Sequence, residues 1–330
     1  MSSVSSPTLL ANFFRATSAT DLFSARSTYA ERKSTAGPVD TVAISDEANM
    51  LFGVHRAMSL MQMFSRAGID QSSQIAELQE MTEDGFDTYV SVPTDNLVIF
   101  GSSTSRNQKY ETLANARVWT GGGADTVTAG SASEVFLGVG ADTAEVGDSA
   151  LVDGEDGDDT LTAGANSVVV GGAGEDTLTA SSQSEIYGGD GNDTITAGAL
   201  NWVEAGEGDD TVTAIGDEAE VWGQAGNDTL TVAGNSTVSG GVGDDAIVLT
   251  GDDSTVLFGT DHGSDTVRGS VSSTLKFGEG FQAKTLAVKV EGDDLIIAFS
   301  GREETITYKD YKGSSPSLVF ADGTTFSLKF

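Results

Sequence analysis

A 17-residue periodicity is the feature that most constrains the fold of this chain. A glycine stands two residues before each of nine regularly spaced aspartates, so the motif G-x-D marks every repeat. The spacings between successive aspartates are 17, 17, 17, 17, 17, 18, 17 and 20 residues, and the aspartates are Asp125, Asp142, Asp159, Asp176, Asp193, Asp210, Asp228, Asp245 and Asp265. A repeat of this length predicts a solenoid, because each unit can bury its apolar face only against its neighbours.

Two apolar positions keep the same register as the aspartates. A β-branched residue stands seven residues before each of the first eight, and an apolar residue stands two residues after it, as Val169 and Leu178 do around Asp176. Each repeat therefore predicts two short strands whose alternation points these residues inward. A glycine-rich turn such as 171–176 and a shorter turn such as 164–166 join the strands. We predict a mainly β fold, a parallel β-roll that is a right-handed β-solenoid with 17–18 residues per coil.

The charge pattern would by itself suggest a different state. Residues 118–267 contain 29 acidic residues and no lysine or arginine, within a 330-residue chain whose formal net charge is −33. Such a composition is typical of disordered acidic segments. A disordered polyanion, however, has no reason to keep glycine, aspartate and apolar positions in register over eight repeats, so we expect this stretch to fold.

Folding the acidic stretch requires cations. Stacked coils place one aspartate above the next at about 4.8 Å, and two like charges at that distance cost roughly 3 kcal/mol at an effective dielectric constant near 20. A whole column of them would outweigh the ~5–15 kcal/mol net stability of a typical domain. Carboxylates and backbone carbonyls are hard oxygen donors, which favours calcium over magnesium or zinc. The shorter turn has no G-x-D motif, so we expect several calcium ions, about one per pair of stacked turns, on one edge of the roll only.

Two repeats show the motif most clearly. Residues 171–179 read GGAGEDTLT and residues 188–196 read GGDGNDTIT; both resemble the G-G-x-G-x-D-x-Φ-x nonapeptide of RTX (repeats-in-toxin) calcium-binding β-roll proteins. The resemblance implies that each ion lies between successive turns, held by aspartate carboxylates and turn carbonyls. Carried over position by position, the metal ligands are Asp125, Asp142, Gly157, Asp159, Gly172, Gly174, Asp176, Gly189, Gly191, Asp193, Gly206, Gly208, Asp210, Gly226, Asp228, Gly241, Gly243, Asp245 and Asp265.

The C-terminal segment carries a second resemblance. It contains GDDLIIAF, ETITYKDY and LVFADGTTF, which resemble the segment that follows RTX repeats in proteins exported by type I secretion. In that family the export signal is C-terminal and uncleaved. The N-terminus lacks a basic n-region and a long apolar h-region. We therefore expect a secreted, extracellular or cell-surface protein that is exported by the type I machinery without a cleaved N-terminal signal peptide.

Three regions are expected along the chain. Residues 1–85 form an N-terminal region that is partly disordered and then helical, because residues 45–68 and 71–81 show apolar residues at helical spacing. Residues 86–267 form the calcium-binding solenoid. Residues 268–330 alternate apolar and polar positions in short segments, which predicts an antiparallel β cap that covers the last coil and carries the secretion signal. His262, in the last turn, is expected to be solvated rather than a ligand, because calcium prefers oxygen.

Composition narrows the functional classes. The negative charge argues against nucleic acid and anionic membranes as partners, and no segment is long and apolar enough to span a membrane. With no cysteine, two histidines and no catalytic motif, we expect no enzyme. We expect a secreted calcium-binding structural protein of a surface layer, matrix or adhesion system, which self-associates through an outward apolar stripe that includes Trp119, Phe136, Tyr187 and Trp222. Two alternatives stay open: a calcium-dependent ice-binding protein that uses its T-x-T pairs, and an accessory module of a secreted enzyme.

Overall fold

The computed structural model describes residues 88–92, 98–101, 106–269, 272–311 and 316–328. All of them belong to the compact unit that spans residues 52–330. The helices expected at 45–68 and 71–81 lie outside the described residues. In the described part the chain is almost entirely β-strand, with a single 3₁₀ turn, η1 (Ala283–Thr285). The mainly β class predicted from the sequence is confirmed.

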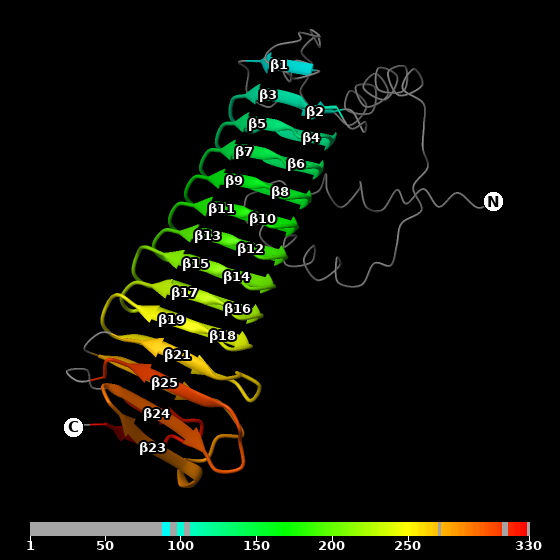
Figure 1. Cartoon of the computed structure of the whole chain (residues 1–330). Coiled ribbons are helices and arrows are strands. Elements are labelled where there is room, and N and C mark those ends of the chain that lie inside the picture. The colour runs from blue at the N-terminus through cyan, green and yellow to red at the C-terminus, as the bar shows by residue number, and fades with distance from the viewer. Residues whose placement is uncertain (1–87, 93–97, 102–105, 270–271, 312–315, 329–330) are drawn as a thin grey trace. The chain divides into compact units, whose positions relative to one another are not determined.

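Two long sheets build the coils, and each coil adds one strand to each sheet (Figure 1). The 14-stranded sheet contains, in spatial order, β1 (Thr88–Val92), β3 (Gln108–Thr112), β5 (Thr126–Ala129), β7 (Thr143–Val146), β9 (Thr160–Ala163), β11 (Thr177–Ala180), β13 (Thr194–Ala197), β15 (Thr211–Ala214), β17 (Thr229–Val232), β19 (Ala246–Leu249), β21 (Asp265–Arg268), β25 (Thr305–Lys309), β24 (Asp294–Phe299) and β23 (Leu286–Glu291). The 13-stranded sheet contains β2 (Val98–Phe100), β4 (Arg117–Gly122), β6 (Glu134–Val139), β8 (Leu151–Asp156), β10 (Val168–Ala173), β12 (Glu185–Asp190), β14 (Trp202–Glu207), β16 (Glu220–Ala225), β18 (Thr237–Val242), β20 (Ser254–Phe258), β22 (Ser273–Phe277), β26 (Ser317–Phe320) and β27 (Thr325–Ser327).

The coils stack in register, so that equivalent positions of the repeat lie opposite one another. Leu178 of β11 pairs with Ile195 of β13 in one parallel ladder, and Val169 of β10 pairs with Ile186 of β12 in the other. Because side chains alternate along a strand, the same set of residues in every coil points between the two sheets. This arrangement is the parallel solenoid that the periodicity predicts.

A thin aliphatic core fills the space between the sheets. Every position that the sequence predicts to point inward is at most 1% exposed: Val118, Val127, Val135, Ala144, Val152, Leu161, Val169, Leu178, Ile186, Ile195, Val203, Val212, Val221, Leu230, Val238 and Ile247. The apolar register is therefore confirmed. The turns, and with them the repeat aspartates, therefore lie at the two edges of the solenoid, and the G-x-D turns share one edge.

The C-terminal strands continue both sheets before they close them. β25 pairs in parallel with β21, and β26 pairs in parallel with β22, as strands of a further coil would. β24 and β23 then add antiparallel strands to one sheet, and β27 adds one to the other. Phenylalanines replace the small aliphatic residues in this part of the core, and the rings of Phe277 and Phe281 lie 5.1 and 4.9 Å from that of Phe299. Antiparallel strands at the C-terminal end were predicted and are present.

Candidate calcium-binding edge

The repeat aspartates line one edge of the solenoid. The first eight lie in the turn that leads from a strand of the 13-stranded sheet to a strand of the 14-stranded sheet, as Asp176 lies between β10 and β11, and Asp265 is the first residue of β21. We call this column, from Asp125 to Asp265, the aspartate edge. Its side chains are not on the surface: Asp159 and Asp176 are 0% exposed, and Asp265, the most exposed of the nine, is 3% exposed. The fold therefore buries carboxylate side chains, which are among the most costly groups to remove from water.

One oxygen of each carboxylate links neighbouring coils. The backbone N–H of Asp159 donates to Oδ1 of Asp176 at 2.8 Å, and that of Asp176 donates to Oδ1 of Asp193 at 2.8 Å. The same bond recurs along the whole edge, from the donor Gln108 to the acceptor Asp265. Each aspartate thus holds the preceding coil through a charge-assisted hydrogen bond, a role that the sequence reasoning did not assign to it.

The second oxygen of the carboxylate is buried and has no hydrogen-bond partner in eight of the nine aspartates. These oxygens are Oδ2 of Asp125, Asp142, Asp159, Asp176, Asp193, Asp210, Asp228 and Asp245. Burial raises the pKa of each carboxyl, for example to about 7 in Asp159 and to about 6 in Asp176. A buried carboxylate oxygen without a donor is costly. A cation or a proton bound at this oxygen would remove the cost.

A second oxygen faces the same space as Oδ2. Gly171, five residues before Asp176, has no side chain, and a Cβ atom built on it would overlap both Oδ2 of Asp176 and the carbonyl oxygen of Gly188 in the next coil. The same pair of oxygens converges at Gly154, Gly188 and Gly223. A carboxylate and a carbonyl from adjacent coils thus share a gap that only glycine leaves open, which is the donor chemistry that calcium prefers. Within the described ranges no three acidic or histidine side chains converge, so a metal here must use backbone carbonyls as well.

The predicted glycine ligands lie in this turn or near the end of the strand that leads into it. Each has a positive φ, as Gly174 does at +142°, and the group is Gly157, Gly172, Gly174, Gly189, Gly191, Gly206, Gly208, Gly226, Gly241 and Gly243. A Cβ on Gly174 would overlap the carbonyl oxygen of Gly157 in the preceding coil. These glycines are therefore required by the backbone and by stacking, and their role as metal ligands stays a prediction. The glycines nearest the unpartnered oxygen, such as Gly171, were missed, although their recurrence five residues before the aspartate is visible in the sequence.

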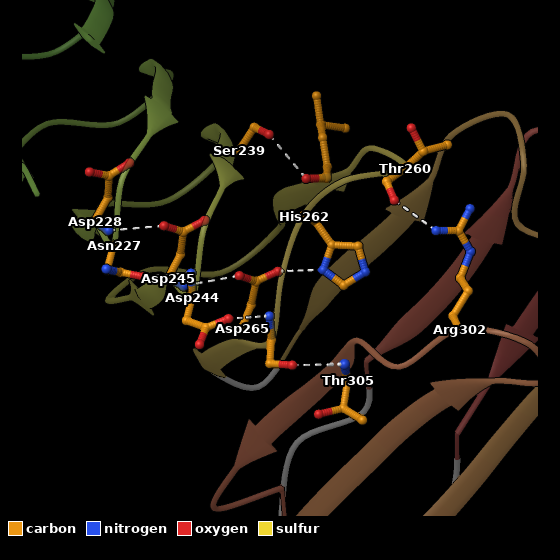
Figure 2. Close-up of polar contacts among 12 residues, drawn as sticks. Asn227, Asp228, Ser239, Asp244, Asp245, Thr260, His262, Asp265, Arg302 and Thr305 are labelled. Atoms are coloured by element: carbon orange, nitrogen blue, oxygen red, sulfur yellow. Dashed lines mark hydrogen bonds and ion pairs between the residues drawn. The ribbon is translucent and has the colours of Figure 1, made fainter. Parts of the chain in front are cut away.

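A second ladder runs along the exposed side of the same turns. The residue directly before each repeat aspartate is often Asp or Asn, and its Oδ1 accepts the backbone N–H of the equivalent residue in the following coil, as Asp158 accepts from Glu175 at 2.9 Å. Further acceptors of this kind are Asn107, Asn192, Asp209, Asn227 and Asp244, the last two of which appear in Figure 2. This ladder points from one coil to the next in the direction opposite to that of the buried aspartates. Side-chain hydrogen bonds therefore link adjacent coils on both the buried and the exposed side of this turn.

The opposite edge of the solenoid uses neutral groups where the aspartate edge uses carboxylates. Ser167 is 1% exposed, and its Oγ accepts the backbone N–H of Ala150 at 3.1 Å. The next two coils continue with Ser184 and Asn201, whose side-chain oxygens accept from the coil before them. Neutral side chains complete these turns without a buried charge, and the expectation that ions bind on one edge only stays a prediction.

The last turn departs from the others. His262 is 3% exposed, so the expectation that it is solvated is wrong. Its Nδ1 lies 2.8 Å from Oδ2 of Asp265, the oxygen that has no partner in the eight preceding turns (Figure 2). The ring packs against Phe258 and Phe281, with centroids 5.3 and 5.7 Å away. The sequence reasoning missed this pair because it judged histidine as a calcium ligand and not as a hydrogen-bond donor to a carboxylate.

The outward apolar stripe is present on the 13-stranded sheet and is half-buried. Trp119 stacks on Phe136 with ring centroids 5.6 Å apart, and Tyr187 and Trp222 occupy equivalent outward positions further along. Trp202 was not predicted to be part of it, but its ring lies 5.9 Å from that of Trp222. The stripe thus forms aromatic pairs rather than a continuous ridge.

The repeat motif is shared with a known protein family. The model of the RTX calcium-binding nonapeptide repeat matches the chain in four copies, over residues 151–167, 165–185, 183–201 and 200–230. No curated protein sequence matches the chain. Among solved structures, the extracellular lipase LipA from Serratia marcescens is similar at 19% identity, over 72% of this chain and 41% of the lipase chain, with a TM-score of 0.28. The family match therefore covers residues 151–230, and the solenoid that contains them fits the β-roll of the RTX family.

Proposed function

We propose that calcium ions bind along the aspartate edge, that their binding drives the folding of the solenoid, and that the folded protein is a structural component outside the cell. The observation that carries this proposal is the column of eight buried carboxylate oxygens without a partner, in a stretch that has no lysine or arginine. Among the residues that the structure describes, no lysine or arginine forms an ion pair with these aspartates. A bound cation would complete these turns with the carboxylates ionised, whereas the metal-free fold would need protons on groups whose pKa values are about 6 to about 7.

Each ion would be held between two coils. In the coil of Asp176, the residues that face the shared gap are Asp176 through Oδ2 and Gly188 through its carbonyl oxygen. Calcium would supply a double positive charge at this oxygen pair, and the turn residues would orient the ligands and keep them out of water. At about 1 mM calcium and a Kd near 10⁻⁴ M, each site stabilises the fold by about 1 kcal/mol. Several sites together would equal the net stability of an ordinary domain.

A low-calcium cytoplasm and a calcium-rich exterior would place folding after export. In this proposal residues 268–330 carry the type I secretion signal beside their role in closing the sheets, and residues 1–85 form a separate N-terminal region. In the described part of the chain, no helix has the length and apolarity needed to cross a membrane. The half-buried aromatic stripe would provide contacts to a second copy, as a surface-layer, matrix or adhesion protein requires. The role proposed is structural rather than catalytic.

One experiment tests calcium-coupled folding and self-association together. The full-length protein is measured by far-UV circular dichroism and size-exclusion chromatography in EDTA, and again after calcium or magnesium is added in excess over the chelator. We expect the β signal to appear with calcium and not with magnesium, and the elution volume to report whether folded copies associate. A β signal and a melting temperature that are the same in EDTA and in calcium would refute calcium-coupled folding.

Ice binding is a second candidate, and one observation favours it. The outward threonines of the 14-stranded sheet lie in two straight columns over five consecutive coils, none of them buried: Thr160, Thr177, Thr194, Thr211 and Thr229, and Thr162, Thr179, Thr196, Thr213 and Thr231. Such a regular hydroxyl array could order water. Thermal hysteresis in calcium, lost on replacing the outward Thr194 by tyrosine, would support this candidate; absence of hysteresis and of ice shaping would remove it.

A further inference from the structure

The aspartate edge has the same arrangement in four interior coils but a different one at each end of the column. In the coils of Asp159, Asp176, Asp193 and Asp228, the carboxylate Oδ2 and the carbonyl oxygen five residues before the aspartate of the next coil face a common gap at a glycine, and Oδ2 has no hydrogen-bond donor. The column of aspartates ends before the two sheets do, because β1 pairs with β3 ahead of Asp125 and β25 pairs with β21 beyond Asp245. A metal bound at either end of the column would therefore have a repeat aspartate on one side only.

At the N-terminal end, a glutamine takes the place of the aspartate. Gln108 lies 17 residues before Asp125, is 1% exposed, and its backbone N–H donates to Oδ1 of Asp125 at 2.7 Å. Its Nε2 donates to the carbonyl oxygen of Thr120 at 3.3 Å. Thr120 precedes Asp125 by five residues, which is the position of the carbonyl that faces the gap in the interior coils. The Tyr110 hydroxyl donates to Oε1 of the same glutamine.

The gap at this end is therefore closed by protein donors. Gly101 lies where Gly171 lies in its own coil, and a Cβ on it would overlap the carbonyl oxygen of Thr120 and contact Oε1 of Gln108. The two oxygens that converge here are thus of the same kind as in the interior, but one belongs to a neutral amide. The amide N–H and the phenol O–H satisfy both oxygens, so this coil buries no charge.

At the C-terminal end of the column, the repeat position is still an aspartate, Asp265, and its Oδ2 has a hydrogen-bond partner in His262. A carboxylate can only accept, so the imidazole of His262 donates from Nδ1 to Oδ2 of Asp265. The carbonyl oxygen of Thr260, five residues before Asp265, corresponds to the carbonyl that would face Oδ2 of Asp245, and it accepts from Nη1 of Arg302 at 2.7 Å. The hydroxyl of Ser264 accepts from the backbone N–H of Thr305, which is shown in Figure 2. Arg302 also lies over the ring of Phe281, 4.4 Å from its centroid. The cap strands thus supply donors to the last turn from outside.

We propose that Gln108 and His262 are end groups of the calcium column, whose donors occupy the positions that calcium takes in the interior coils. Calcium then binds in the interior coils whose glycine leaves the gap open, which are those of Asp159, Asp176, Asp193 and Asp228, and Asp265 is a structural hydrogen-bond acceptor rather than a metal ligand. This inference rests on the proposed function. It revises the position-by-position transfer of ligands at one residue, because Asp265 matches the motif but not the environment of the other aspartates.

Calcium stoichiometry tests the proposal through a matched pair of variants. Asp228→Asn and Asp265→Asn change the same atom in the same column, and each full-length variant is titrated with calcium in a calorimeter after circular dichroism has shown that it folds. We expect Asp228→Asn to bind one calcium ion fewer than the wild type, and Asp265→Asn to bind the same number. Loss of one ion in Asp265→Asn would overturn the assignment of His262 as an end group.

A gain-of-site variant tests the other end and does not depend on the first pair. Gln108→Glu places a carboxylate where the amide stands, so we expect one additional calcium ion per chain, whereas Gln108→Asn should leave the number unchanged. An unchanged number in Gln108→Glu would overturn the role of Gln108. If the wild type binds no calcium, the proposed function is refuted. If the wild type binds calcium but Asp265→Asn loses an ion or Gln108→Glu gains none, only the role of the corresponding end group is refuted.

Discussion

Replacing one buried carboxylate by its neutral isostere should stabilise the metal-free protein and at the same time weaken its response to calcium. Asp176→Asn is the suitable change. The asparagine Oδ1 can still accept the backbone N–H of Asp159, and its Nδ2 can donate to the carbonyl oxygen of Gly188, which faces the same gap as Oδ2. The substitution therefore keeps the ladder and the shape of the turn and removes only the charge.

The magnitude follows from the pKa of this carboxyl. Burial raises it from 3.8 to about 6 in the metal-free fold, and a rise of that size disfavours the folded state by roughly 3 kcal/mol at about pH 7.5. We expect Asp176→Asn to recover an amount of this order when calcium is absent. The stabilisation gained on adding about 1 mM calcium should in turn be smaller than that of the wild type by the share of one site, about 1 kcal/mol.

Urea unfolding followed by far-UV circular dichroism, in EGTA and in calcium, measures both quantities. Asp158→Asn is the matched control, because Asp158 lies in an equivalent turn, is exposed, and uses Oδ1 for a backbone hydrogen bond that asparagine retains. Its effect should stay within about 0.5 kcal/mol in both conditions. The reasoning fails if Asp176→Asn is less stable than the wild type in EGTA, or if its calcium increment equals that of the wild type.

Three further results are expected from the geometry of the turns. Because the metal-free folded state holds protons on buried aspartates with pKa values of about 6 to about 7, such as Asp159, its unfolding free energy should fall as pH rises from about 4 to about 7; urea titrations in EGTA at several pH values check this, and a rise over that window would contradict it. Gly174→Ala should lower the unfolding free energy by roughly 2 kcal/mol or more, because φ is +142° and the new Cβ meets the carbonyl oxygen of Gly157; a melting temperature equal to the wild type would count against the stacking described. Leu200→Gly should raise the unfolding free energy by roughly 0.5–1 kcal/mol, because Leu200 is 49% exposed and holds a φ of +59°; a lower melting temperature in calcium would show that its side chain contributes more than its backbone costs.

The periodicity of the sequence was enough to predict the coil, the inward residues and the aspartate column. A position such as Leu178 repeats at a fixed distance from Asp176, and parallel stacking in register leaves one arrangement for both. The same reasoning could not separate the two oxygens of a carboxylate, because the sequence does not show which backbone N–H group approaches each one. It therefore treated the aspartates only as metal ligands and missed their hydrogen bonds to the preceding coil.

The ends of the column were beyond prediction for a different reason. Gln108 does not match the motif and His262 lies outside the repeat positions, and both acquire their roles from residues that the solenoid brings near. The parallel pairing of β25 with β21 joins segments about 40 residues apart that share no repeat pattern. Contacts of this kind depend on three-dimensional packing at one place and not on a rule repeated along the chain.

Every coil is linked to the next by the same hydrogen bond, from the backbone N–H of one repeat aspartate to Oδ1 of the following one. One coil can therefore take the place of another in the stack. Excising residues 177–193 would join Asp176 to Thr194, the same dipeptide that follows each of the neighbouring turns, and Asp159 and Asp176 would still meet as before. Length is therefore an adjustable property of this architecture, which duplication or loss of a 17-residue segment can change in whole steps. The ends of the column at Gln108 and His262 differ from the interior coils, so such duplications and losses are tolerated only between them.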